Sequence, residues 1–362
     1  MIYRNLYFKP MNWRVRIIRI CLPAYLLFTS CLSFAQSVPI EKVRSDFRQL
    51  LQRPKVDPRP SIQSYTQDSI LIEKGFFYSE TSEKVPILVY KPISKKTQKL
   101  PVVICLHGTG GTKDAEAIKN LLSRFVKLGF MSVAIDARYH GERMPADKSR
   151  NYYVEAITKA WNDKQAPYEH PFFLDTVYDL WRLVDYLEQR SDVDPKRIGM
   201  MGISMGGIET WMAASVDTRI KVAVPVIAAQ SFKWSLENDR WQGRARTIWG
   251  AHVQAAKDLG DTSVNKENIT TFWKKLLPGI TNEFDCPSMI RLFAPRPLLI
   301  LNTEEDQNCP IEGARIAFEA AKNEYRSRKA LNKLKIDVEP NEPHRFTARH
   351  LEMTIEWFKM WL

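Results

Sequence analysis

The residues with the clearest chemical potential form the run Gly202-Ile203-Ser204-Met205-Gly206-Gly207. This run follows an apolar stretch at 197–201 and precedes a segment that can form a helix. A G-x-S-x-G pattern between a strand and a helix forces a sharp reversal of the chain and leaves the serine hydroxyl exposed at the turn. The sequence therefore predicts that Ser204 is a nucleophile. The competing interpretation is a serine that only caps the following helix.

A serine nucleophile needs a base within hydrogen-bond reach, and the base needs an acid that orients it. Three histidines follow the serine: His252, His344 and His350. We prefer His344, because it lies in a loop between the last expected strand and the last expected helix. His252 falls inside an insertion, and His350 lies within the last helix, where a surface or packing role is expected.

The orienting acid is expected directly after the apolar stretch at 297–301. Three carboxylates follow one another there: Glu304, Glu305 and Asp306. Spacing favours Asp306, which stands four residues before the proline that begins the next helix. Glu305 is the alternative acid, and Glu304 is expected to be a solvated loop charge.

Negative charge that develops on a substrate carbonyl oxygen must meet hydrogen-bond donors placed in advance. Met205, the residue after the nucleophile, is expected to provide one backbone N–H group of this oxyanion hole. The second donor is assigned to Thr109 in the glycine-rich loop 107–111, with Gly108 and Gly110 as alternatives. The loop lacks the G-x-x-x-x-G-K-[ST] pattern of phosphate-binding loops.

The elements that would position these residues alternate along the chain. Strand-like stretches lie at 70–78, 85–90, 101–106, 130–135, 197–201, 222–227, 297–301 and 334–338, and helical patterns at 114–128, 171–190, 205–215, 311–326 and 346–361. This alternation predicts an α/β fold with one eight-stranded, mostly parallel sheet and helices on both faces. The first two strands are expected to form an antiparallel edge.

Two segments are longer than the usual connections between strands and helices. They span residues 137–170 and 228–290, and both follow carboxyl ends of strands, where open α/β sheets bind ligands. The second is expected to form a helical cap whose tryptophans pack it onto the domain. The alternative is that one or two of them line a substrate pocket. These tryptophans are Trp234, Trp241, Trp249 and Trp273.

With these motifs, the chain resembles the α/β-hydrolase superfamily, in particular bacterial esterases and dienelactone-hydrolase-like or prolyl-oligopeptidase-like enzymes. The resemblance extends over about residues 70–362 and rests on 107–111, Asp136–Arg143, Gly202–Gly206, Asp306 with Pro310, and His344. For the Asp136–Arg143 segment it implies a structural role, with direct substrate contact by Arg138 or His140 as the alternative. The serine at the elbow departs from the cysteine nucleophile of true dienelactone hydrolases.

The triad and the resemblance together predict a serine hydrolase that cleaves carboxylic esters through an acyl-enzyme intermediate, without a cofactor. The first 35 residues predict in addition that this hydrolase is exported. The expected partner is a small-molecule or carbohydrate ester, such as an acetylated sugar, because sugar faces stack on aromatic rings. One alternative is a serine peptidase of the prolyl-oligopeptidase type, which usually carries a large propeller before the catalytic domain. Another is a non-catalytic binding protein with the hydrolase fold.

The first 35 residues have the pattern of a signal peptide. Five cationic residues and no acidic residue precede an apolar stretch at 20–34. This stretch is shorter than a membrane-spanning helix. Ser33-Phe34-Ala35 then provides small residues at −3 and −1 relative to Gln36. We therefore expect a periplasmic or secreted protein. Attachment to a membrane is expected only in the alternative case of a lipoprotein acylated at Cys31.

The remaining chain is divided into an N-terminal arm and one catalytic domain. Residues 36–68 are polar and include Pro54, Pro58 and Pro60, which favours an arm. The α/β-hydrolase domain is expected at 69–362, with the cap insertion at about 228–290. Whether Cys286 and Cys309 form a disulfide is left open, as is the oligomeric state.

Composition limits the class of partner. The 362 residues are 44% hydrophobic and 26% charged, which is typical of a globular protein and excludes a disordered or polytopic membrane protein. Removal of residues 1–35, with five cations and no anion, lowers the net charge from +12 to +7. No basic cluster interleaves with aromatic residues, so nucleic-acid binding is not expected. No metal-type spacing of Cys or His residues occurs, so no metal is expected.

Overall fold

The computed structural model describes residues 39–93, 99–146, 151–165 and 169–362. The expected signal peptide at 1–35, its cleavage position before Gln36 and the alternative acylation site Cys31 lie outside the described residues. The described residues belong to one unit, which spans Val38–Leu362.

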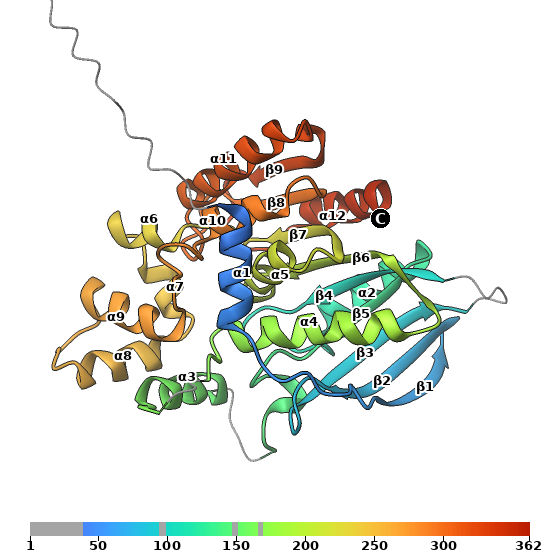
Figure 1. Cartoon of the computed structure of the whole chain (residues 1–362), viewed down its shortest axis with the longest axis horizontal. Coiled ribbons are helices and arrows are strands. Elements are labelled where there is room, and N and C mark those ends of the chain that lie inside the picture. Colours follow the sequence, from blue (N-terminus) through green and yellow to red (C-terminus); the bar gives the residue numbers. More distant parts are fainter. Residues whose placement is uncertain (1–38, 94–98, 147–150, 166–168) are drawn as a thin grey trace, which may run out of the picture. The chain divides into compact units, whose positions relative to one another are not determined.

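A nine-stranded sheet, in the order β1-β2-β3-β5-β4-β6-β7-β8-β9, runs through this unit (Figure 1). The pairs from β1 to β5 along this order are antiparallel, and all pairs from β5 to β9 are parallel. All eight expected strands are present, and β1 is a ninth that the sequence did not reveal. The strands are β1 (Ser61–Gln67), β2 (Ile70–Tyr78), β3 (Lys84–Pro92), β4 (Leu100–Leu106), β5 (Met131–Ile135), β6 (Val193–Ile203), β7 (Ile220–Val226), β8 (Leu298–Thr303) and β9 (Leu334–Glu339).

The central strands are buried on both faces, because successive side chains enter two different hydrophobic clusters. In β4, Val102 and Ile104 belong to one cluster, while Val103 and Cys105 belong to the other. Helices from distant parts of the chain cover each face, as the alternation of strands and helices predicted. The helices of the first cluster are α4 (Leu174–Gln189), α5 (Met205–Val216) and α11 (Ile311–Ser327), and those of the second are α2 (Glu116–Lys127) and α12 (Ala348–Trp361).

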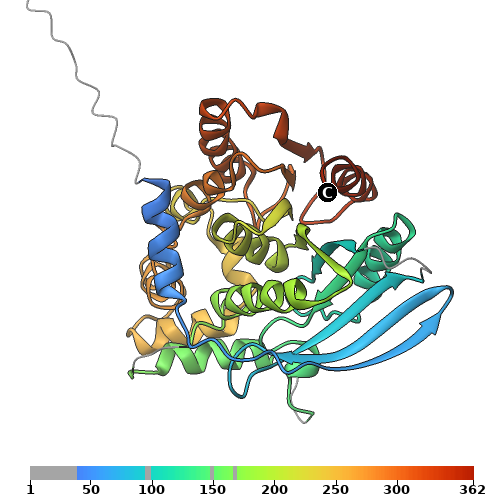
Figure 2. The same ribbon diagram turned by 45° about the vertical axis from the view of Figure 1, so that its right-hand side comes forward.

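The segment at 36–68 is not an arm, which corrects the expectation from its prolines. Its described part contains α1 (Ile40–Leu50) and strand β1. In α1, Val43 and Phe47 are fully buried. The Phe47 ring lies edge-on to the rings of Trp181 and Phe284, with distances between ring centroids of 6.1 and 5.1 Å. β1 is polar and largely exposed, and it joins the sheet through antiparallel backbone pairing with β2 (Figure 2).

Both long connections contain helices. Figure 1 shows α8 and α9 of the expected cap beside α3, which belongs to the connection after β5. The tryptophans of the cap differ in exposure: Trp273 and Trp241 are buried, whereas Trp249 is 44% exposed. The remaining helices are α3 (Tyr152–Asn162), α6 (Phe232–Glu237), α7 (Gln242–Arg246), α8 (Trp249–Asp258), α9 (Lys266–Leu276), α10 (Cys286–Ile290), and the 3-10 turns η1 (Gly141–Arg143), η2 (Arg291–Phe293) and η3 (Leu331–Lys333).

Among the described residues, no helix is both long enough and apolar enough to span a membrane.

Cys105, Cys286 and Cys309 are buried free thiols. The Cys286–Cys309 disulfide that the sequence left open therefore does not form in this structure.

If α1 belongs to the folded domain, Phe47→Ala should lower the free energy of unfolding by about 3–5 kcal/mol, because it removes a fully buried ring and leaves a cavity. Urea denaturation at pH 7 measures the difference. The exposed Ser45 on the same helix provides the control, and Ser45→Ala should change the free energy by less than about 0.5 kcal/mol. Equal stability of Phe47→Ala and the parent would show that α1 does not contribute to the fold.

Candidate active site

Ser204 occupies a tight turn between β6 and α5. Its backbone angles, φ 55° and ψ −112°, lie in a region that a residue other than glycine rarely adopts. The turn is held from two sides: Ser204 N donates to Val226 O at 2.9 Å, and Gly206 N donates to His107 O at 3.1 Å. The strained serine between a strand and a helix has the geometry of a nucleophile elbow. It also excludes a serine that merely caps α5, because the side chain makes no capping hydrogen bond.

The structure brings together the three residues assigned to the triad. His344 lies in the loop between β9 and α12, and its Nε2 atom is 2.7 Å from Ser204 Oγ. Its Nδ1 atom is 2.7 Å from Asp306 Oδ2. A carboxylate only accepts hydrogen bonds, so Nδ1–H donates to Asp306 and Nε2 remains the acceptor for the serine hydroxyl. Asp306 itself is 2% exposed and accepts Asn308 N at 2.8 Å and Cys309 N at 2.9 Å, which fix its carboxylate.

The other two carboxylates of this loop have a different role. Glu304 N donates to Glu339 O at 2.9 Å, and Glu305 N donates to Glu342 O at 3.0 Å. Asn341 N also donates to the Glu304 carboxylate at 3.1 Å. These bonds connect the loop that carries the acid to the loop that carries the base, while both glutamate side chains are exposed. Neither Glu304 nor Glu305 replaces Asp306 beside His344.

The two histidines that the sequence set aside lie elsewhere. His252 is 1% exposed within α8, and its Nε2 atom accepts a hydrogen bond from Trp273 Nε1 at 3.2 Å. Burial lowers the pKa of His252 to about 4, so its ring is neutral at pH 7. His350 is fully buried in α12 beside Asp337, with a distance of 3.1 Å from Nε2 to Oδ2.

A group around His350 could in principle hold a metal ion. Asp337, Glu339 and His350 each offer a ligand atom, and these atoms lie within 4.8 Å of one another. Arg349, however, donates to Asp337 Oδ2 at 2.6 Å and to Glu339 Oε2 at 2.8 Å. The guanidinium therefore already supplies positive charge between the two carboxylates. A second group, Asp306 with Cys309 and His344, shares its atoms with the triad.

The two groups assigned to the oxyanion hole lie on either side of the elbow. Met205 is the first residue of α5, so its N–H group has no acceptor within the helix. Thr109 lies in an exposed turn that Gly111 N closes by donating to Gly108 O at 2.9 Å. A β-carbon added at Gly108 would lie 3.6 Å from Ser204 Cβ, so this loop contacts the nucleophile. The roles of Met205 and Thr109 as donors remain predictions.

The glycine-rich loop is held by a buried ion pair. Lys113 and Asp136 are both fully buried, with 3.0 Å between Lys113 Nζ and Asp136 Oδ2. Asp136 also accepts Lys113 N at 2.8 Å and Glu142 N at 3.0 Å, and His107 Nε2 accepts Ala137 N at 3.1 Å. Burial opposes the charge of Lys113, but Asp136 and neighbouring acids raise its pKa. The loop at 107–113 and the loop after β5 therefore form one rigid unit.

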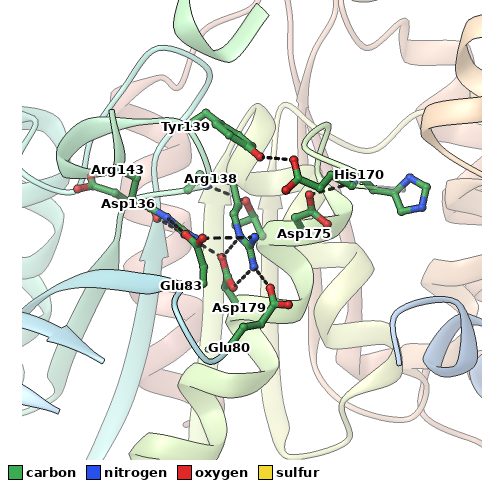
Figure 3. Close-up of polar contacts among 12 residues, drawn as sticks. Glu80, Glu83, Asp136, Arg138, Tyr139, Arg143, His170, Asp175 and Asp179 are labelled. Atoms are coloured by element: carbon green, nitrogen blue, oxygen red, sulfur yellow. Dashed lines mark hydrogen bonds and ion pairs between the residues drawn. The ribbon is translucent and has the colours of Figure 1, made fainter. Parts of the chain in front are cut away.

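Figure 3 shows how the loop after β5 is in turn bound to α4. Arg138 donates to both oxygens of Asp179, at 2.8 and 2.9 Å, and Arg143 donates to the same carboxylate at 2.8 Å. Glu80 pairs with Arg138 and Glu83 with Arg143 (Figure 3). Burial raises the pKa of Asp179, but the two guanidinium groups outweigh it and lower that pKa well below its usual value. These contacts support the structural role that the resemblance implied for this segment.

The cap is anchored to the loop that carries the acid. A β-carbon at Gly243 in α7 would lie 1.9 Å from Gln307 O, so no other residue allows this close approach. Beside it, Arg244 is 1% exposed, and its Nη2 atom lies 2.8 Å from Cys309 Sγ. The sequence pattern alone does not single out Gly243, Arg244, Lys113 or Asp179, since none belongs to a local motif. A buried charged residue has no sequence signature until its partner is known.

Comparisons with known proteins place this site in context. Residues 87–276, more than half of the chain, match the model of the Dienelactone hydrolase family. "Putative hydrolase YtaP" of Bacillus subtilis (strain 168) is 27% identical over 245 residues, which cover 64% of this chain and 68% of that protein. The acetyl xylan esterase from Paenibacillus sp. R4 superposes with a TM-score of 0.62 at 18% identity, over 89% of this chain and 94% of that one.

A second solved structure is similar to this chain to the same extent. Acetyl xylan esterase 1 from Thermoanaerobacterium sp. JW/SL YS485 has a TM-score of 0.62 at 18% identity, over 89% of this chain and 98% of that one. At this level of identity the two structures establish the shared fold alone.

Removal of the buried cation beneath the glycine-rich loop should destabilise the protein. Lys113→Met leaves the Asp136 carboxylate buried without its cation, so we expect a loss of about 3–5 kcal/mol in the free energy of unfolding, measured in urea. Lys119→Met, at a lysine that is 40% exposed, is the matched control and should change the value by less than about 0.5 kcal/mol. Equal effects of the two substitutions would contradict the structural role of the pair.

His252 should make stability depend on pH. Its folded pKa of about 4 lies below the unfolded value of 6.5, so between these values the unfolded state binds a proton that the folded state does not. Stability therefore falls as the pH decreases through this range. His252→Gln removes this titration, so by pH 4 the parent should lose about 2–3 kcal/mol more than the variant relative to pH 7.5. Urea denaturation at both pH values tests this, and a parent–variant difference independent of pH would contradict it.

Proposed function

The chain belongs to the dienelactone hydrolase family, and from this premise we propose that it hydrolyses carboxylic esters with Ser204 as nucleophile. The observation that carries the proposal is the hydrogen-bonded series from Ser204 through His344 to Asp306, with 2.7 Å at each step. A serine at a sharp turn, an imidazole acceptor and a buried acid are the parts that acyl transfer to a hydroxyl requires.

In the proposed reaction, Ser204 Oγ attacks the acyl carbon while His344 Nε2 takes the hydroxyl proton. The Met205 and Thr109 N–H groups would bind the oxyanion, and the positive end of α5 points toward it. His344 then gives the proton to the departing alcohol, which leaves an acyl group on Ser204. A water molecule attacks the acyl group with His344 as base, and collapse of this second intermediate returns the proton to Ser204. Asp306 keeps Nδ1 protonated throughout.

The proposed substrate is an ester of a carbohydrate, such as an acetylated sugar. Two proteins with the same fold are named acetyl xylan esterases, and the cap presents an exposed tryptophan. Aromatic side chains offer an apolar face for the C–H groups of a sugar ring. This substrate class agrees with the second interpretation of the cap tryptophans, in which part of them serve binding.

We further propose that the enzyme acts outside the cytoplasm, because residues 1–35 have the composition of a signal peptide. N-terminal sequencing of the protein purified from a periplasmic or culture fraction tests this step. A mature chain that begins at Gln36 supports it, and an N-terminus retained in the cytoplasmic fraction contradicts it.

Ser204→Ala and His344→Ala should each reduce kcat on 4-nitrophenyl acetate by roughly 10⁴-fold or more, since triad members act as a unit. Ser204→Ala should also abolish labelling by a fluorophosphonate probe. The control is Ser64→Ala, an exposed serine on β1, which should keep full activity and labelling. Undiminished turnover by His344→Ala would contradict the mechanism.

The same assay separates the alternative activities. Acetyl and longer acyl esters are compared with peptide anilides at equal enzyme concentration. Faster cleavage of the anilides would favour the peptidase of the prolyl-oligopeptidase type. Absence of both labelling and turnover in the parent would favour a non-catalytic binding protein.

A further inference from the structure

Two neighbouring depressions lie between the glycine-rich loop and the cap. The inner one is a cavity of about 180 Å³ that is lined by Thr109, Gly110 and Tyr139, among others. The second one, which we call the outer groove, has a volume of about 760 Å³ and lies between α3 and the helices α7 and α8. The two adjoin each other, because Val154 and Thr247 are in the walls of both.

The inner cavity lies beside the loop that approaches the nucleophile. Thr109, the expected second oxyanion donor, is in its wall, and a β-carbon built on the preceding Gly108 would lie 3.6 Å from Ser204 Cβ. The inner cavity is smaller than the roughly 300–1,000 Å³ of typical ligand pockets. It has room for an acyl group or one sugar ring, whereas the outer groove has room for further units of a longer substrate.

The outer groove combines an exposed aromatic ring with polar side chains. Trp249 lines it and is 44% exposed, although Trp273 and Trp241 of the same cap are buried. Single exposed apolar residues are common, but this one lies in the wall of a depression that adjoins the cavity beside the glycine-rich loop. Neutral polar side chains, Thr158 and Gln254, lie in the same wall. An apolar face beside hydroxyl and amide groups matches the two sides of a sugar ring.

The charges of the outer groove point to a neutral occupant. Among the described residues of its wall, the charged ones are the acid Glu155 and the base Arg246, so this part of the lining carries no net charge. Polyanions such as nucleic acids require several unopposed cations along their path. A neutral, hydroxyl-rich chain has no such requirement and uses hydrogen bonds and stacking instead.

The groove wall is also fixed relative to the triad. Arg246 and Thr247 follow Gly243 and Arg244 in sequence, and those two residues hold α7 against the loop that carries Asp306. A substrate unit at Trp249 would therefore lie at a constant distance from the reacting serine. Binding energy gained far from the ester can then contribute to kcat/KM for long substrates only.

We propose that the outer groove binds a chain of neutral sugar residues and that Trp249 stacks on a ring beyond the one that carries the ester. This inference rests on the proposed esterase function. It assigns the substrate as an esterified oligosaccharide or polysaccharide rather than a single sugar, and it assigns Trp249 as a residue that determines specificity for chain length.

The test compares chain length across variants. The probes are chemically acetylated xylo- and manno-oligosaccharides of six units, the acetylated monosaccharides and 4-nitrophenyl acetate. For the parent, kcat/KM on at least one hexasaccharide should exceed that on its monosaccharide by about tenfold, the equivalent of one stacked ring. Trp249→Ala should remove most of this gain, and Trp249→Phe should retain more than half of it. Activity of all variants on 4-nitrophenyl acetate should stay unchanged.

Leu259→Ala is the matched control, because Leu259 is also 44% exposed at the end of α8 but does not line the groove. It should keep the full gain with chain length. The inference is overturned if the parent shows no such gain on either oligosaccharide, or if Trp249→Ala keeps it. A parent inactive toward 4-nitrophenyl acetate and unlabelled by the fluorophosphonate probe would instead overturn the esterase function, and the inference with it.

Discussion

The hydrogen bond between Ser204 and His344 is the interaction on which the site depends, and it joins residues 140 positions apart in sequence. The parallel sheet makes this possible. β6, β8 and β9 all end at the same edge, so the elbow, the acid loop and the base loop emerge near one another. Backbone hydrogen bonds from Glu304 to the end of β9, and from Glu305 to the loop after β9, then fix the acid loop relative to the base loop. The position of the imidazole therefore follows from strand order and two short loops.

Buried charge plays a comparable part on the other side of the serine. The glycine-rich loop belongs to no helix or strand, so few backbone hydrogen bonds of its own hold it. The Lys113–Asp136 pair and the Arg138–Asp179 contacts connect it to the loop after β5 and to α4. Removing charges from water is unfavourable, and the paired hydrogen bonds offset much of that penalty. In the proposed mechanism, this support would hold the Thr109 N–H group in place before the substrate binds.

The sequence predicted the sheet and the triad because both have local signatures. Dense Val, Ile and Leu runs marked the buried strands, and the glycines around Ser204 marked the elbow. β1 was missed because its side chains are polar and exposed, so only backbone pairing with β2 reveals it. In α1 the apolar spacing was present, at Val43 and Phe47, but the prolines that follow it obscured it. Pairings such as Arg138 with Asp179 depend on tertiary contact and have no local pattern.

The four cap tryptophans show why local pattern also failed to separate packing from binding. All four share the same residue type and the same insertion, so the sequence could not rank them. Their exposure depends on how the short helices pack in three dimensions. The Trp273 ring lies edge-on to the rings of Phe232 and His252 in the core, whereas Trp249 begins α8 at the outer groove. Gly243 allows α7, the helix that precedes α8, to lie directly against Gln307 of the acid loop. In the proposed binding mode, this contact would position Trp249 relative to the triad, so that the same loop supports both catalysis and recognition.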